Sequence, residues 1–284
     1  MLRRLIVLAG SYAFWAGGGC RRASGAVVLC YHGVADAYAG RFRKQMDILA
    51  RRAHVVDAAE RECPSNGPHR VALTFDDALA SFKENALPVL QQHRFPSTIF
   101  VPTGYIGKAC TWMRSPEQYE REEGHAMAPR DREQFLSDAV MDEDDLRALG
   151  GRVAIGSHGV RHLNLARLAD DEMEREIVES KHMLERLTGK PVGTISLPHG
   201  GYKPATLTAC RLHGYHRVFL IEPGFAFLAP DEFLTPRVVV DPSDWPCEFR
   251  LKALGAYGWL SRLTGKRRPA RGPENPGKRN HAHG

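Results

Sequence analysis

The amino-acid sequence predicts an α/β protein whose parallel strands close, or nearly close, into a barrel. Short β-branched segments alternate with segments whose apolar residues recur at a spacing of about 3.6, the pattern of strands joined by helices. Seven strand-like segments are present, and this number favours a barrel of about seven or eight strands. With 284 residues, 43% of them hydrophobic, the chain is long enough to bury the core of such a barrel.

The expected elements follow in chain order. Strands are expected at 26–32, 70–75, 97–102, 152–157, 192–198, 216–221 and 237–240. Helices are expected at 42–52, 81–94 and 170–189. Pro88 should kink the second helix, and Gly189 should end the third, whose many charges are most simply its solvated face. The polar segment 108–141 breaks the alternation and is expected to be a loop insertion, of a length typical of functional lids.

The charge distribution removes the main support for a nucleic-acid partner. The net charge is +6, but residues 265–284 alone carry six basic residues and one acidic residue. That segment is poor in apolar residues and contains several Pro and Gly, so we expect a disordered basic tail on a nearly neutral folded body. The six cysteines show no paired spacing, and we expect neither a CxxC metal site nor a dense disulfide framework.

The N-terminal segment 1–25 joins two arginines, Arg3 and Arg4, to a short apolar stretch at 5–16. This order resembles the start of a signal peptide, but no convincing cleavage site follows and the stretch is too short to span a bilayer comfortably. The alternative is a helix lying on a membrane surface or on the folded domain. We favour a cytoplasmic or membrane-associated protein over an exported one, with residues 1–22 as the segment for peripheral membrane association.

Two adjacent aspartates, Asp76 and Asp77, follow the expected strand at 70–75. In a parallel barrel the carboxyl ends of the strands carry the active site, so both aspartates lie where catalytic groups are found. A lone aspartate there would be interpreted as the cap of the next helix, but a pair is less easily explained in that way. Because adjacent residues leaving a strand point in different directions, the two carboxylates can serve two tasks.

Two histidines, His158 and His162, follow the expected strand at 152–157 and lie on the same rim. Positions i and i+4 share a face of a helical turn, which would let both imidazoles meet one cation. Together with one carboxylate they make the three-ligand set of an open catalytic zinc site. Either Asp76 or Asp77 would complete the set, and the other would be free to act as a base. The same geometry permits cobalt, nickel or iron.

Two further segments reach this rim. Pro198, His199 and Gly200 form a tight turn after a strand, where backbone amides would face a developing oxyanion, although alone the segment is only a turn. Trp245, beside an aspartate after the last expected strand, suits stacking on a sugar ring and suits a core position equally well.

With these residues in view, the sequence resembles the polysaccharide deacetylase family, also called the NodB-homology family or carbohydrate esterase family four. The motifs TFDD at 74–77, SHGVRH at 157–162 and DPSDW at 241–245 match three family motifs in the same order. The resemblance covers about residues 27–260. It implies a distorted (β/α)7 TIM-like barrel as one domain at 26–264, and hydrolytic removal of acetyl groups from N-acetylated sugars.

The resemblance also implies residue roles. By position, Asp76 is the general base, and Asp77, His158 and His162 hold one divalent metal, with zinc as the default. The metal would polarise the attacking water and the acetamide carbonyl, and the backbone amide at His199 would assist the oxyanion.

Three departures from the family pattern affect these roles. The family's third motif has an arginine that orients the base, followed by Pro-Tyr, but here Ser196 and His199 stand in place of the arginine and the tyrosine. Arg237 is a conceivable substitute for the arginine. The fifth motif supplies the general acid as a histidine, which the C-terminal region lacks outside the tail. Exopolysaccharide-modifying relatives look similar in an early Tyr-His pair, so His32 is expected either to act as the acid or to be structural.

The sequence therefore predicts a metal-dependent hydrolase that removes N-acetyl groups from an exopolysaccharide or its lipid-linked precursor. An N-acetylated glycan is the expected substrate. The departures keep open a catalytically impaired barrel that only binds glycans, and nothing in the sequence excludes peptidoglycan or a small acetylated molecule as substrate.

Overall fold

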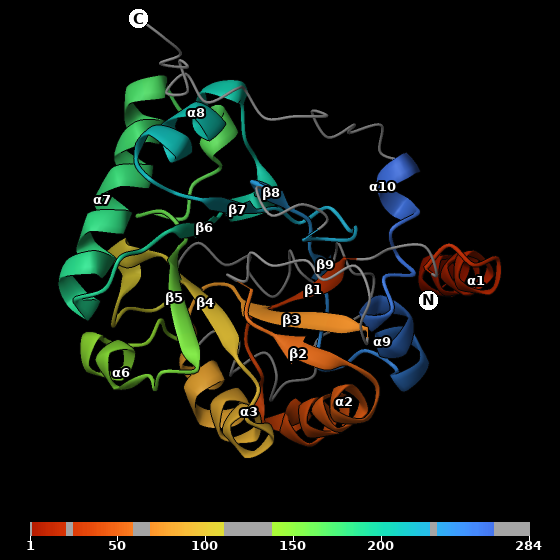
Figure 1. The fold of residues 1–284 in the computed structure, drawn as a ribbon. Coiled ribbons are helices and arrows are strands. Elements are labelled where there is room, and N and C mark those ends of the chain that lie inside the picture. The colour runs from red at the N-terminus through yellow and green to blue at the C-terminus, as the bar shows by residue number, and fades with distance from the viewer. Residues whose placement is uncertain (1, 21–24, 59–68, 111–137, 228–231, 264–284) are drawn as a thin grey trace, which may run out of the picture.

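The computed structural model of the chain describes residues 2–20, 25–58, 69–110, 138–227 and 232–263. A single sheet of parallel strands, in the order β8-β7-β6-β5-β4-β3-β1-β9 with β2 beside β3, curls into a half-barrel (Figure 1). The strands are β1 (Ala26–Tyr31), β2 (His54–Val56), β3 (Arg70–Phe75), β4 (Ser97–Val101), β5 (Val153–Ser157), β6 (Thr194–Ser196), β7 (Arg217–Phe219), β8 (Leu234–Thr235) and β9 (Val238–Val239). The predicted α/β distorted-barrel fold class is confirmed.

The expected strands are all present, each within two residues of its predicted ends. β2 and β8 were not expected from the sequence. They contain three and two residues.

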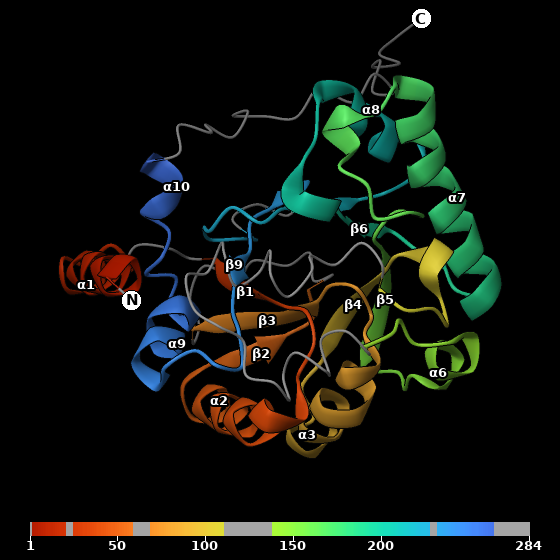
Figure 2. The ribbon, with the colours of Figure 1, turned by 180° about the vertical axis from the view of Figure 1, so that it is seen from behind.

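Helices cover the outer surface of the curled sheet (Figures 1 and 2). They are α2 (Ala39–Arg52), α3 (Leu87–His93), α6 (Glu143–Ala148), α7 (Asp170–Thr188), α8 (Pro204–Leu212) and α9 (Pro246–Ala253). Two more, α1 (Leu2–Ala16) and α10 (Leu260–Leu263), lie at the margin of the molecule. Short 3₁₀ turns occur at Asp36–Tyr38, Thr103–Tyr105, Leu165–Arg167 and Pro198–Gly200.

The predicted helix boundaries are close to the observed ones. Pro88 stands in the first turn of α3, and a π-helical segment at Phe82–Ala86 precedes it, so the expected kink is an irregular turn ahead of the proline. Gly189 ends α7 in the left-handed conformation, with a φ of 66°.

Alternation along the strands places one aspartate inside the barrel. The odd-numbered residues of β3 pack in the large core that the helices cover, whereas Ala72 belongs to a smaller inner cluster with Phe100 and Phe219. Side chains of a strand point to opposite faces in turn, so Thr74 and then Asp76 continue the inner series. The carboxylate of Asp76 thus closes the inner column of side chains at the carboxyl end of β3.

The expected insertion at 108–141 is described only at its two ends, because residues 111–137 lie outside the described chain, as does the tail at 265–284. The backbone N–H of Val140 donates to the carbonyl of Lys108 at 3.0 Å, which joins the two ends. The N–H of Met141 donates to the carbonyl of Ala78 at 2.9 Å, which ties them to the loop after β3. A lid role for this insertion stays a prediction.

Candidate active site and metal centre

Three buried side chains converge at the carboxyl ends of β3 and β5. The Nε2 atoms of His158 and His162 lie 3.5 and 3.2 Å from Oδ1 of Asp77. One ligand atom from each residue falls within 4.8 Å of the others, and the side chains are at most 8% exposed. The sequence therefore predicted the residues that come together, and Asp77, rather than Asp76, is the carboxylate that faces the imidazoles.

The residues of this cluster fit a divalent cation. Oδ1 of Asp77 is buried and has no hydrogen-bond donor of good geometry in the described chain, which is costly for a carboxylate unless a cation faces it. Nδ1 of His158 lies 2.8 Å from the carbonyl of Ser196, to which it must donate, so Nε2 presents its lone pair. Burial lowers the pKa of His158 to about 4, and the imidazole is neutral at neutral pH. The imidazoles of His158 and His162 together with the carboxylate of Asp77 are a donor set that zinc accepts.

The loop that carries His158 and His162 differs from the helical turn that the sequence led us to expect. Residues 158–162 form no helical turn. The chain instead reverses through Gly159 at a φ of 73° and His162 at a φ of 56°. The expectation that a helical face brings the imidazoles together is therefore wrong, although the pairing itself is present.

Backbone strain is concentrated among these residues. Asp77 and His162 adopt positive φ values of 70° and 56°, and so does His199, at 57°. Residues with a Cβ rarely adopt positive φ. Each such residue costs on the order of 1–3 kcal/mol and persists only where the surrounding structure holds its backbone in place. Such positions cluster at functional sites, and their shared location here supports a site that is held in place by its surroundings.

The side chain of Glu176 on α7 holds the loop that carries the two histidines. Its Oε2 accepts hydrogen bonds from the backbone N–H groups of Val160 and Arg161, at 2.7 and 2.9 Å. Its Oε1 accepts from Nε of Arg161 at 2.6 Å, and the carboxylate is 2% exposed. The charged face of α7 was expected to be solvated, and for Glu176 that expectation is wrong. The missed signal was its place in the buried series Met173, Glu176, Ile177, Ser180 and Leu184.

We expect Glu176→Gln to weaken metal binding about 10–100-fold, the usual cost of disturbing an outer partner of a metal site. The side-chain NH2 of the glutamine would face an N–H donor, either that of Arg161 or those of the loop backbone, and could not accept its hydrogen bond. The substitution would also remove the negative charge that holds the loop. Competition with a chromophoric chelator measures the affinity. The matched control is Glu172→Gln, because Glu172 pairs with the same arginine at 2.7 Å but accepts no hydrogen bond from a loop N–H in the described chain. Equal affinities in Glu176→Gln and the wild type would refute this role.

Asp76 is held apart from the triad by a buried arginine. The two terminal nitrogens of Arg237 donate to the two oxygens of Asp76, each at 2.7 Å. The hydroxyl of Ser196 donates to Oδ2 at 3.1 Å and accepts from Arg237 at 2.8 Å. Ser196 occupies the position where the family motif has its arginine, and here the guanidinium arrives from the segment between β8 and β9 instead.

The arginine determines the ionisation of the aspartate. Burial alone would raise the pKa of Asp76, but the charge and the forked hydrogen bonds of Arg237 outweigh it and hold the pKa well below its ordinary value. Asp76 is therefore a carboxylate at neutral pH. Nε of Arg237 donates to the carbonyl of Leu220 at 2.8 Å, so the guanidinium is fixed on three sides.

The other predicted site residues lie at different distances from this centre. His32 follows β1, whose register with β3 places it next to Asp76, and its side chain is exposed. His199 is exposed in the turn after β6, with its ring edge-on to His162 at 4.8 Å between centroids. Pro198 and Gly200 are buried in the same turn.

Trp245 lies elsewhere. It is the residue before α9, and the guanidinium of Arg4 from α1 covers one face of its ring at 4.4 Å from the centroid. No contact between Trp245 and the triad is found in the described chain, and a role in sugar stacking stays a prediction.

Comparison with known proteins decides the family. The family model described as "Polysaccharide deacetylase" matches residues 64–218, more than half of the chain. The chain belongs to the polysaccharide deacetylase family. The curated "Putative polysaccharide deacetylase YxkH" of Bacillus subtilis is 29% identical to this family member over 187 residues, which are 66% of this chain and 55% of the relative. The chain thus matches only about half the length of that relative.

Solved structures share the fold of this polysaccharide deacetylase family member. The IcaB structure from Ammonifex degensii has a TM-score of 0.65 at 20% identity and covers 83% of this chain and 98% of its own. The Streptococcus pyogenes deacetylase PplD, solved with acetate, has a TM-score of 0.61 at 19% identity and covers 81% and 98%. At these identities the likeness establishes the fold alone.

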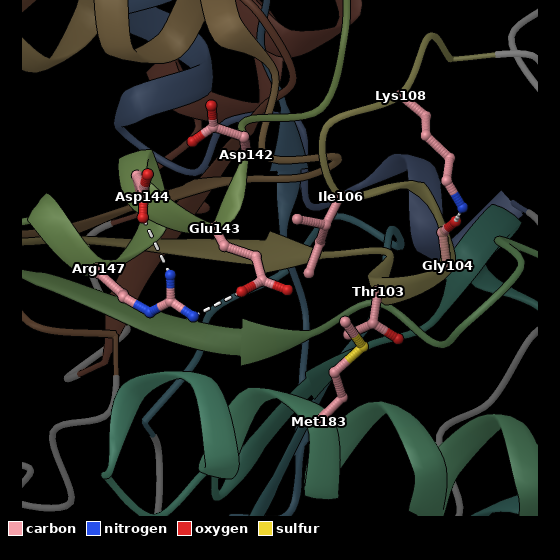
Figure 3. Close-up of a pocket in the computed structure, with 9 residues that line it drawn as sticks. All are labelled: Thr103, Gly104, Ile106, Lys108, Asp142, Glu143, Asp144, Arg147 and Met183. Atoms are coloured by element: carbon pink, nitrogen blue, oxygen red, sulfur yellow. Dashed lines mark hydrogen bonds and ion pairs between the residues drawn. The ribbon is translucent and has the colours of Figure 1, made fainter.

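A pocket elsewhere on the surface does not belong to this site. It lies between the turn after β4, α6 and α7, and Figure 3 shows the side chains that line it, among them Thr103, Glu143, Asp144, Arg147 and Met183. The guanidinium of Arg147 pairs with Glu143 and Asp144, and none of the predicted catalytic residues lines the pocket.

Proposed function

We propose that the protein is a metal-dependent hydrolase that removes N-acetyl groups from a glycan, with an exopolysaccharide or its lipid-linked precursor as the substrate. The observation that supports it most is the division between the two adjacent aspartates. Asp77 faces His158 and His162, while Asp76 is held off that cluster by Arg237. One carboxylate is thereby available to a cation and the other to a proton.

A divalent cation held by Asp77, His158 and His162, zinc in our proposal, would supply a Lewis acid that polarises the acetamide carbonyl and makes water more acidic. Asp76 then acts as the general base that takes the proton from the attacking water. Its depressed pKa keeps Asp76 unprotonated at neutral pH, so the base is present in the required ionisation state. Arg237 and Ser196 orient its two oxygens.

The remaining groups complete the hydrolysis. Water adds to the carbonyl carbon, the C–N bond breaks, and the products are acetate and a sugar amine. His32, exposed beside Asp76, would donate the proton that the leaving amine requires. The turn Pro198–Gly200 would place the backbone amide of His199 toward the tetrahedral oxyanion.

Membership of the family favours an acetylated glycan over other amides, and the acetate bound in the PplD structure agrees with a deacetylase on this fold. The paired Asp76–Arg237 and the buried triad argue against the impaired, glycan-binding alternative, because a barrel without turnover has no need for either. Peptidoglycan and small acetylated molecules remain as competing substrates for the test.

The proposal is tested by an acetate-release screen with metal-reconstituted protein. Substrates are oligomers of N-acetylglucosamine, peptidoglycan fragments and N-acetylated monosaccharides. We expect the highest kcat/KM for the N-acetylglucosamine oligomers, with one acetate released per amine formed. Preference for peptidoglycan fragments would change the substrate but keep the reaction. Absence of acetate from every substrate would refute the proposed function.

A further inference from the structure

α1 is fixed along the surface of the domain by one of its faces. Nε of Arg4 donates to Glu248 on α9 at 2.8 Å, and Nε1 of Trp259 donates to Ser11 at 3.0 Å. A Cβ on Gly10 would lie 2.7 Å from the ring of Trp259, so this close approach requires glycine. The helix therefore lies against the body rather than projecting from it.

The opposite face of α1 is apolar and exposed. We define the outer face of α1 as Leu2, Leu5, Ile6, Tyr12 and Trp15. Leu2, Ile6 and Tyr12 are 73%, 60% and 59% exposed, and most of the large apolar side chains exposed in the described chain belong to this one helix. Figure 1 places α1 at the margin of the molecule, beyond α9. Contiguous apolar surface of this kind marks an interaction site.

The sequence in and next to α1 carries charge of one sign. The first 35 residues contain four arginines, Arg3, Arg4, Arg21 and Arg22, and no acidic residue. The basic tail at 265–284 follows α10, and Trp259, directly before α10, is the residue packed on Gly10. The described chain therefore ends shortly after a residue that packs on α1, and residues 36–264 are together net acidic.

We propose that the outer face of α1 seats the protein on an anionic lipid bilayer. An apolar helix face flanked by arginines, with tyrosine and tryptophan at one end, has the composition of helices that lie in the membrane interface. No helix in the described residues is long and apolar enough to cross a membrane, and α1 has 15 residues. The basic segments at both ends complement the negative surface of such a bilayer. A second copy fits less well, because pairing two outer faces would bring like charges together.

The test is co-sedimentation of the full chain with lipid vesicles. We expect binding to phosphatidylcholine vesicles with about one third phosphatidylglycerol, weaker binding to pure phosphatidylcholine, and loss as salt screens the charges. The double variant Ile6→Glu/Tyr12→Glu should bind at least about tenfold more weakly, because it removes two apolar side chains that would insert into the bilayer and adds negative charge. Both positions are exposed in solution, so the variant should fold, as a thermal melt checks.

The matched control is Leu212→Glu. Leu212 is 72% exposed, nearly as exposed as Leu2 of the outer face, but it lies on α8 rather than on α1. It should bind vesicles as the wild type does. The proposal would be overturned if the wild type did not bind anionic vesicles. It would also be overturned if the double variant bound them as strongly as the wild type. If the wild type did not bind vesicles but sedimented as a dimer, and the double variant sedimented as a monomer, the outer face would be assigned to a second copy instead.

Discussion

An Asp76→Asn variant should lose about 10²–10⁴-fold in kcat, the usual contribution of a positioned general base, while its metal affinity stays unchanged. Asparagine keeps the shape of the side chain but cannot accept a proton. The three candidate metal ligands are unchanged, because both oxygens of Asp76 are engaged by Arg237 and the cluster is made by Asp77, His158 and His162. The loss should therefore appear in turnover and not in binding of the cation.

The comparison variant for this prediction is Asp77→Asn, one residue further along the chain. It removes the carboxylate that faces His158 and His162, so it should lose metal and, with the metal, activity. Metal content by mass spectrometry and acetate release under single-turnover conditions separate the two variants. Full activity of Asp76→Asn, or loss of metal from this variant, would contradict the assignment of Asp76 as the base and Asp77 as the metal ligand.

Arg237→Met should lower the free energy of unfolding by about 3–5 kcal/mol, because it leaves the buried carboxylate of Asp76 without a counter-charge. The arginine side chain is 0% exposed, and its guanidinium lies 5.5 Å from the ring centroid of Phe100, so solvent cannot replace it. Methionine fills a similar volume and keeps apolar packing against that ring. The variant should also lose turnover, since Asp76 is no longer oriented.

A double-mutant cycle isolates the pair. Arg237→Met/Asp76→Asn removes both charges together and should be more stable than the sum of the single changes predicts, by on the order of 0.5–3 kcal/mol. Urea unfolding of the wild type, both single variants and the double variant measures this coupling. If the effects of the two single changes on the free energy of unfolding simply add, the two side chains are not energetically coupled. That result would contradict the role of Arg237 in orienting Asp76.

For a physical reason, the sequence was sufficient for the fold and for the two histidines of the triad, while the family resemblance was needed to choose Asp77 over Asp76. Alternation and strand-end position are local patterns, and in a parallel sheet all carboxyl ends meet on one rim. Asp77 and His158, 81 positions apart in the sequence, could therefore be placed together without any knowledge of the intervening chain. The short strands β2 and β8 were missed.

Other parts of the site depend on long-range closure and on strained backbone. The pairing of Arg237 with Asp76 follows from the curling of the sheet, which brings the segment after β8 to the inner end of β3. The sequence could name Arg237 only as a substitute for a missing family residue. The positive φ of His162 shows no signature in residue type, so the loop was expected as a helical turn.

The central claim is that metal held by Asp77, His158 and His162 enables the chain to hydrolyse an N-acetyl group. The most direct measurement is acetate release from an N-acetylglucosamine oligomer by chelator-stripped protein, before and after zinc is added back. We predict no release above background from the stripped protein and recovery on adding zinc. Equal acetate release by stripped and zinc-loaded protein would contradict the claim.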